Sequence, residues 1–521
     1  MTAQGAKPSS AIGAGGTYEI TQRKDLHMLH NKAVGLPGVL FLTVTGSAPI
    51  SAMFFNVPIG VGYGNGIGVP AAFAVATVVL LLFSVGFAAM ARKVTATGGF
   101  YSFISHGLGR ELGMALGFGS VVAYSVFEAS LCGGFAFFAN AKIMELTGAN
   151  VGWPWLALIM VVVIAALTYF DVKLSTIILG VALIGEIAIL IIFDAGIFTS
   201  PNAMVSGAAV NPANAFVGFA AHKNAAGADL AAGAAAIGLF FAFWSWVGFE
   251  MAPNYGEESR DPKRIVPRSL YISVVGLGIF YTITSWAAVS AYPTLDDAIT
   301  QAQTNSAMFY LQPAAQFIGG WAEQIMSWLI LTGSFACGMA FHNTAARYLY
   351  SLGRERALPV ALGKTHAHYK SPYFASFTQS VIAAIIVILF AIFAGSDDPT
   401  QQAFLMLYGL MAILGAALVM IAQTLVCLSV IVYFRKHHPE DHHWFATLVA
   451  PLIAFVAQAY FVYLLFANID FLGGGFAFAN WILPIVIAVL VAGIAFALYL
   501  KTAKPAVYDQ IGRLIYEGMA K

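Results

Sequence analysis

The chain has 521 residues, of which 60% are hydrophobic and 9% charged, and its mean hydropathy is +0.80. Soluble chains carry about 25% charged residues, so this composition excludes a soluble globular protein. No Lys or Arg occurs between Lys32 and Arg92, and no Asp or Glu between Asp25 and Glu111. The net charge of +1 also gives no sign of a nucleic-acid partner. A single polytopic membrane domain is the simplest interpretation.

A helix needs about 20 apolar residues to cross the hydrocarbon core of a bilayer. Twelve segments of suitable length recur along the chain, separated by polar or Gly/Pro-containing breaks. They are predicted near residues 36–57, 70–91, 112–141, 153–170, 174–198, 231–253, 270–291, 321–346, 375–394, 402–434, 446–467 and 480–500.

The distribution of basic residues predicts the orientation, because Lys and Arg prefer the cytoplasmic loops. With the N-terminus inside, 23 of the 25 Lys and Arg residues fall on the inner side, and only Lys142 and Lys223 fall outside. A miscounted span would invert every later loop and destroy this asymmetry. We therefore expect both termini to be cytoplasmic and the protein to lie in the cytoplasmic membrane.

Two of the predicted spans contain helix breakers. The first span reads Gly46-Ser47-Ala48-Pro49-Ile50, and in a helix interior Gly costs about 1 kcal/mol and Pro about 3 kcal/mol. The sixth span contains Gly248, Glu250 and Pro253, preceded by Phe243, Trp244 and Trp246. A simple proline kink also explains the first break. Breaks in the first and sixth spans together favour two repeats of five helices with a binding site at the interruptions.

Three stretches resemble the amino acid/polyamine/organocation transporters, the amino acid permeases. The most specific runs from Glu250 through Glu258-Ser-Arg-Asp-Pro-Lys-Arg-Ile-Val-Pro-Arg268, and includes the pattern Trp-Ser-x-x-Gly-x-Glu. Gly98-Gly-Phe-Tyr101 with Gly107 and Gly109 is similar to the family's loop between the second and third helices. Arg347 followed by Arg354-Glu-Arg-Ala-Leu-Pro359 is similar to its eighth-helix exit. The resemblance covers about residues 35–434.

The resemblance implies an all-α fold of the leucine-transporter type, with two inverted five-helix repeats, discontinuous first and sixth helices and 12 transmembrane helices. Residues 1–34 are then a cytoplasmic segment, 35–434 the ten-helix transport core, 435–500 a cytoplasmic loop with two peripheral helices, and 501–521 a cytoplasmic tail. The implied function is secondary active transport of an amino acid or related amine by alternating access, with proton-coupled uptake. A polyamine or small-amine carrier, or an exchanger, is the alternative.

The first break departs from the Gly-Ser-Gly type of many amino acid permeases, whose backbone N–H groups hold the substrate carboxylate. Pro49 has no N–H, so carboxylate binding is left to the backbone of Ser47, Ala48 and Ile50. A substrate that lacks a carboxylate is also compatible with this sequence. By resemblance, Trp244 closes over the substrate. We place Gly46, Phe243, Trp246 and Gly248 in the same substrate site.

Ionisable groups within spans are costly and often functional. Glu128, Glu186, Glu250 and His342 are such groups, with no basic residue in the spans to pair with them. Glu128 shares a helical face with Tyr124, and either binds a substrate ammonium group or makes a structural hydrogen bond. The other three are candidates for proton coupling, with backbone capping as the alternative for Glu250 and a structural role for His342.

Other functional classes lack support in the sequence. No Gly-x-Ser-x-Gly, His-Glu-x-x-His or phosphate-binding motif appears, so we expect no enzymatic activity and no cofactor. The isolated carboxylates of otherwise apolar spans do not indicate a channel. The cluster of His437, His438, His442 and His443 is compatible with a metal site, but a solvated loop explains it as well, and no metal is expected.

Overall fold

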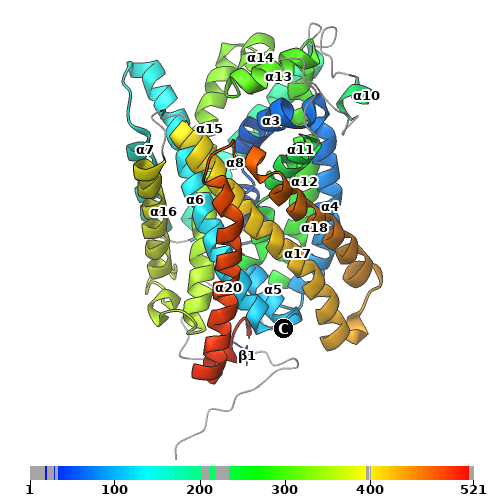
Figure 1. Ribbon diagram of the computed structural model, residues 1–521, viewed down its shortest axis with the longest axis vertical. Helices are drawn as coiled ribbons and strands as arrows, with labels where there is room; N and C mark the ends of the chain where they lie inside the picture. Colours follow the sequence, from blue (N-terminus) through cyan, green and yellow to red (C-terminus); the bar gives the residue numbers. More distant parts are fainter. Residues whose placement is uncertain are drawn as a thin grey trace, which may run out of the picture.

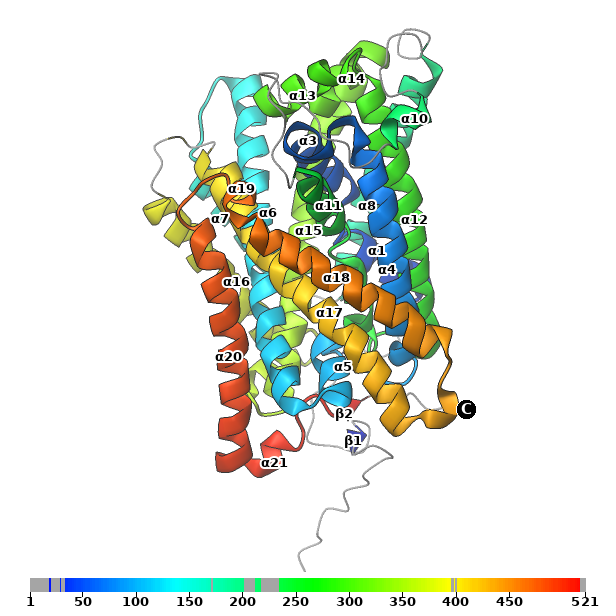
Figure 2. The ribbon, with the colours of Figure 1, turned by 45° about the vertical axis from the view of Figure 1, so that its right-hand side comes forward.

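The computed structural model describes residues 18–19, 29, 33–169, 172–200, 211–216, 234–394, 398 and 401–515. Within these ranges the protein is an elongated bundle of helices (Figure 1). Two short strands, β1 (Tyr18–Glu19) and β2 (Leu514–Ile515), pair in parallel. This pairing brings the first and last described segments together at one end of the bundle (Figure 2). Lys223 and most of the predicted segment 1–34 lie outside the described residues.

Helices occupy all of the segments that were predicted to span the membrane. In the first half of the chain the elements are α1 (Leu36–Val44), α2 (Pro49–Ser51), η2 (Ala52–Asn56), α3 (Val57–Ile59), η3 (Gly60–Asn65), η4 (Gly66–Gly68), α4 (Val69–Ala91), α5 (Gly99–Gly107), α6 (Arg110–Thr147), α7 (Trp153–Thr168), α8 (Val172–Thr199), α10 (Pro212–Ala215), α11 (Ala234–Trp244) and η5 (Phe249–Tyr255).

In the second half they are α12 (Pro262–Ser290), α13 (Leu295–Thr304), α14 (Met308–Phe317), α15 (Gly320–Arg354), η6 (Val360–Gly363), α16 (Tyr373–Phe393), η7 (Gln401–Leu410), α17 (Met411–His437), η8 (Pro439–Asp441), η9 (Phe445–Val449), α18 (Ala450–Ala467), α19 (Ile469–Leu472), α20 (Ala479–Ala503) and α21 (Pro505–Tyr508). Among the larger differences from the predicted boundaries, α12 starts at Pro262 rather than near residue 270, and α15 ends at Arg354 rather than near residue 346. Proline fits the first position of a helix, and the charged first turns extend this helix beyond its apolar part.

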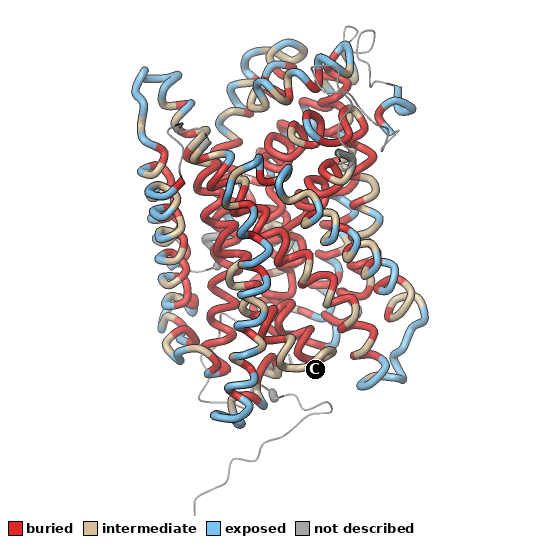
Figure 3. The backbone as a smooth tube through the Cα atoms, viewed as in Figure 1, coloured by how far each residue is buried: buried red, intermediate tan, exposed pale blue. Residues whose placement is uncertain are grey.

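The surface of the bundle suits a hydrocarbon environment. Ten described helical stretches are long and apolar enough to cross a membrane, and α7 is a shorter apolar helix. Large apolar side chains remain exposed on outer helices, including Trp155 (69%), Val181 (69%) and Phe393 (75%). Figure 3 shows such exposed positions along the outside of the bundle and buried positions at its centre. Exposed apolar surface on this scale is unfavourable in water, so the protein is a multi-pass membrane protein.

Both predicted interruptions are present. Helix α1 ends at Val44, and the chain resumes helical geometry only at Pro49, after Ala48 in the left-handed region (φ 41°). Helix α11 ends at Trp244 and is followed by the 3₁₀ segment η5, after Gly248 at φ 128°. Non-glycine residues rarely adopt positive φ, and the described chain places only three in this region. Proline and glycine therefore break these two helices where the sequence predicts.

Candidate functional site

The two interruptions meet in the interior of the bundle. A Cβ atom added at Gly248 would lie 2.3 Å from the carbonyl carbon of Gly46 and 2.5 Å from the backbone nitrogen of Ser47. Only glycine permits this approach, because ordinary contacts with a Cβ atom begin near 3.4 Å. The backbones of two segments about 200 residues apart in sequence therefore touch at the centre of the protein.

Side chains satisfy backbone carbonyls at both breaks. The Ser47 hydroxyl donates to the carbonyl of Trp246 (3.2 Å), and Tyr281 of α12 donates to the carbonyl of Ser47 (2.8 Å). The Cys337 thiol of α15 donates to the carbonyl of Gly46 (3.3 Å). Tyr281 and Cys337 escaped the sequence analysis because nothing local in their helices marks them as partners of a distant break.

Glu186 of α8 sits at the start of the second half of the broken first helix. Its Oε2 accepts the backbone N–H of Ile50 at 3.3 Å, and the side chain is fully buried. Its other oxygen, Oε1, has no hydrogen-bond partner among the described residues. An internal carboxylate thus occupies an N–H group that the resemblance assigns to a substrate carboxylate.

Glu250 has the corresponding position at the second break. It accepts the N–H of Gly248 through Oε2 (2.8 Å) and the hydroxyl of Tyr124 through Oε1 (2.8 Å). Tyr124 in turn stacks on Tyr348 of α15, with ring centroids 5.6 Å apart. The structure thus brings Tyr124 to the junction, and a carboxylate caps broken backbone at each interruption.

Glu128 and His342 belong to a different cluster. Both Glu128 oxygens lie 3.0 Å from Nδ1 of His342, and Gln379 donates to Oε2 at 2.8 Å. His342 Nε2 is 2.8 Å from the Ser376 hydroxyl and 3.1 Å from that of Thr168. Glu128 and His342 are both fully buried. The sequence analysis treated Glu128 and His342 as separate candidates, but in the structure each is the hydrogen-bond partner of the other.

The three aromatic residues around the second break point in different directions. Trp244 stacks on Tyr408 of η7, with centroids 5.6 Å apart. Phe243 instead packs on Phe461 of α18 (4.3 Å), and the ring of Trp246 packs edge-on against Tyr281 (5.2 Å). Trp244 lines a large cavity, whereas Phe243 and Trp246 are not among the residues that line it.

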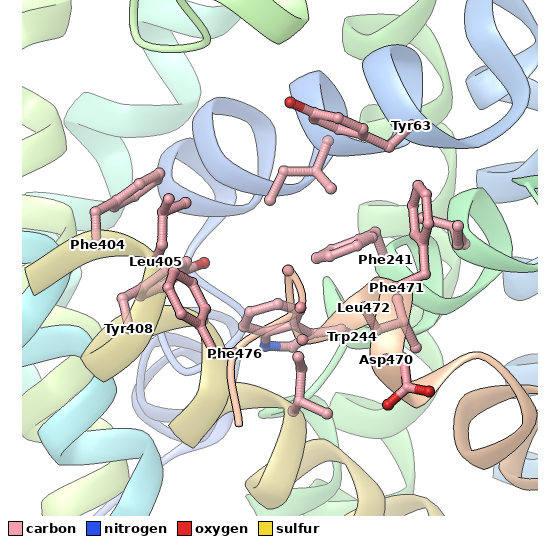
Figure 4. A pocket seen from close by; sticks show the side chains of 17 residues that line it. Tyr63, Phe241, Trp244, Phe404, Leu405, Tyr408, Asp470, Phe471, Leu472 and Phe476 are labelled. Atoms are coloured by element: carbon pink, nitrogen blue, oxygen red, sulfur yellow. The ribbon is translucent and has the colours of Figure 1, made fainter. Parts of the chain in front are cut away.

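That cavity has a volume of about 860 Å³ and lies on the outer side of Trp244, away from the strand pair (Figures 2 and 4). Its walls come from α3 and η3, α11, η7, α17, and the segment 470–476, which begins in α19. Figure 4 shows Tyr63, Phe241, Trp244, Tyr408 and Phe471 around the space. This segment carries no sequence signal of a binding site, because Asp-Phe-Leu-Gly-Gly-Gly-Phe is typical of an ordinary turn between two spans.

Buried ion pairs lie toward the opposite end of the bundle. Arg347 contacts Glu258 at 2.7 Å, and Arg354 contacts Glu257 at 2.5 Å. All four side chains are at most 3% exposed. They connect the end of α15 to the segment after η5, which is the stretch on which the resemblance chiefly rests. The cavity at Trp244 therefore lies toward the end of the bundle opposite the strand pair.

Comparison with known proteins identifies the family. The sequence profile of the amino acid permeases matches residues 38–508. This chain belongs to the amino acid permease family. The branched-chain amino acid permease BcaP of Bacillus subtilis (strain 168) is 23% identical over 369 residues, which cover 67% of this chain and 73% of BcaP. The low-affinity putrescine importer PlaP of Escherichia coli (strain K12) is 23% identical over 390 residues, which cover 72% and 76%.

A third relative, an uncharacterized transporter of Mycobacterium tuberculosis (strain H37Rv), is 28% identical over 364 residues, covering 68% of this chain and 73% of the relative. Membership of a permease family makes this protein a transporter and not an enzyme.

The histidine-rich loop of the permease does not gather its four histidines. Within the described residues, His438, Glu440 and Asp441 place ligand atoms within 4.8 Å of one another. Asp441 is also paired with Lys93 at 2.5 Å, and Glu440 is exposed to solvent. Since the neighbouring Lys93 already neutralises one of the three groups, this arrangement is an exposed ion-pair cluster between two loops.

Proposed function

We propose that this permease is a secondary active transporter that takes up an amino acid or a related amine across the cytoplasmic membrane by alternating access. The observation that carries the proposal is the contact between the two interrupted helices, where Gly46 meets Gly248. Unwound helices at the midplane supply backbone groups that bind substrate in transporters of this architecture. The buried ion pairs toward one end and the cavity above Trp244 toward the other support access from one side at a time.

The proposal includes the leucine-transporter fold, with 12 crossings and a core of residues 35–434 arranged as two inverted repeats. The parallel pairing of β1 with β2 supports it, because two chain ends on one face require an even number of crossings. The 23 basic residues assigned to the inner side support cytoplasmic termini. Residues 435–500 then form the loop and two peripheral helices, represented by α18 and α20.

Proton coupling follows from the two capping carboxylates. Glu186 and Glu250 each accept a backbone N–H at one of the breaks. Protonation of either carboxyl weakens this acceptor, since a carboxylate forms the stronger, charge-assisted hydrogen bond. Proton binding would thereby loosen the geometry of the break and link it to substrate binding. His342 is a third candidate, acting through its contact with Glu128.

Proteoliposomes test this coupling directly. A substrate is first found by a thermal-shift screen of amino acids, polyamines and alkylamines, because a ligand of the folded state raises its apparent stability. Glu186→Gln and Glu250→Gln are then compared with wild type, and Glu323→Gln, on the first turn of α15, is the matched control. The variant at the coupling site should lose accumulation driven by a pH gradient and retain counterflow exchange.

Unchanged accumulation and pH dependence in both Glu variants would show that neither residue carries the proton. Loss of accumulation in Glu323→Gln as well would point to a general defect of the reconstituted protein and not to coupling.

A second candidate, a carrier of amines that lack a carboxylate, is favoured by one observation. The Ile50 N–H is already occupied by Glu186, whose Oε1 has no partner among the described residues. A second carboxylate at this point would be repelled, whereas an ammonium group would gain a charged acceptor. Thermal-shift assays with valine and isobutylamine, and with ornithine and putrescine, separate the two candidates. Stabilisation by the amine of each pair and not by the amino acid would support the second.

A further inference from the structure

The cavity above Trp244 has a chemical character of its own. Seven of its lining residues are aromatic, and the only charged one is Asp470. None of the lining residues, all within the described part of the chain, is Lys or Arg. A volume of about 860 Å³ falls in the range typical of small-molecule sites, about 300–1,000 Å³.

The aromatic side chains form connected walls. Trp244 stacks on Tyr408 at 5.6 Å, and Tyr408 is nearly parallel to Phe404, with centroids 5.2 Å apart and planes at 5°. Across the cavity, Tyr63 meets Phe471 edge-on at 6.2 Å. Figure 4 shows these rings around the space, and they are carried by η3, α11, η7 and α19. A ligand here contacts ring faces on more than one side.

Asp470 is one of the residues that line this cavity, and its carboxylate points away from the aromatic rings (Figure 4). It is exposed to solvent, and its backbone is fixed because the Gly475 N–H donates to the Asp470 carbonyl at 3.0 Å. Gly474 and Gly475 permit this tight turn because they adopt positive φ values of 63° and 74°. The segment between α18 and α20, which includes the short helix α19, thus places a negative charge beside the aromatic space.

This combination selects a particular class of ligand. Aromatic faces attract organic cations, by about 0.5–1 kcal/mol at exposed sites and more where water is excluded, and the Asp470 carboxylate attracts cations to the adjacent cavity. The carboxylate of a zwitterionic amino acid would find no basic side chain among the lining residues. We propose that this cavity is a binding site for an ammonium ion with an apolar body, such as an arylalkylamine, on the outer side of Trp244. The inference rests on the proposed transport function only in one respect, namely that the substrate passes through this site during transport.

Equilibrium binding of tritiated 2-phenylethylamine to the full-length purified protein tests the site. Asp470→Asn should weaken binding about three- to fivefold, as for loss of an exposed ion pair. Raising the salt concentration should weaken binding to wild type more than to this variant. Asp296→Asn is the matched control, because Asp296 is also exposed, lies at the start of α13 near the same end of the bundle, and does not line the cavity.

A second variant tests the aromatic wall without touching the charge. Tyr63 is 38% exposed, so Tyr63→Leu should fold, and it should weaken 2-phenylethylamine binding about two- to fivefold through loss of one ring face. The neutral probe 2-phenylethanol should bind wild type and Asp470→Asn equally. Undetectable binding of the amine to wild type, equal affinity in Asp470→Asn, or an equal loss in Asp296→Asn would each overturn the proposal.

Substrate accumulation in proteoliposomes, measured in parallel, separates this inference from the proposed function. If wild type accumulates a substrate but the amine shows none of the variant effects, the cavity site is wrong and transport stands. If the amine binds with the expected pattern of variants and nothing is accumulated, the site stands and the proposed transport function fails.

Discussion

The contact between the two helix breaks predicts that Gly248→Ala damages this permease more than any ordinary glycine substitution. The new Cβ atom would lie 2.3 Å from the Gly46 carbonyl carbon, so one backbone must move by about 1 Å to reach an ordinary 3.4 Å contact. A non-glycine residue at φ 128° adds backbone strain of about 1–3 kcal/mol, and overpacking adds about 1–3 kcal/mol. We expect a total destabilisation of about 2–6 kcal/mol.

Gly276→Ala is the matched control, because Gly276 is in α12 with no atom within 4 Å of the added Cβ. A helical Gly→Ala change there should be neutral or stabilising by up to about 1 kcal/mol. Thermal unfolding in detergent and uptake into proteoliposomes should therefore both be impaired in Gly248→Ala and normal in Gly276→Ala. Wild-type unfolding temperature and uptake in Gly248→Ala would show that the two breaks need not approach closely, and would refute the reasoning.

Three further predictions concern separate parts of the protein. Trp244→Ala should reduce substrate accumulation at least tenfold with normal folding, because Trp244 lines the cavity at the end of α11 and by resemblance closes over the substrate. Normal uptake by this variant would show that Trp244 does not act as a lid. Glu128→Gln should lower the unfolding temperature, because it removes the charged partner of His342 and so destabilises the folded state by about 1–3 kcal/mol. A tenfold loss of amine affinity without destabilisation would instead show that Glu128 binds substrate. His106, in α5 outside the candidate spans, has its pKa lowered to about 3 by burial, so its stabilising contribution is complete above pH 6.5 and declines as the pH falls toward 3. His106→Gln should therefore lose about 1 kcal/mol less than wild type between pH 6.5 and 5.5, and equal pH dependence of the two unfolding curves would contradict a buried neutral histidine.

The sequence by itself determined the membrane class, the positions of the helices and both interruptions. These features follow from local chemistry: apolar runs of about 20 residues must bury their surface in lipid, and Pro49 or Gly248 disrupts a helix whatever surrounds it. The motif between Glu250 and Arg268 likewise indicated the family through its residue types and their spacing alone. Only helix ends, such as the start of α12 at Pro262, differed by several residues.

The tertiary structure decided which buried groups meet. Glu128 and Tyr124 are one helical turn apart on α6, yet Tyr124 bonds to Glu250 while Glu128 bonds to His342, more than 200 residues away. Helical spacing places both side chains on one face, but the packing of the surrounding helices sets the partner of each, and no local pattern encodes that packing. The same reason applies to the cavity. Tyr63, Tyr408 and Asp470 become one site only because three distant segments converge above Trp244.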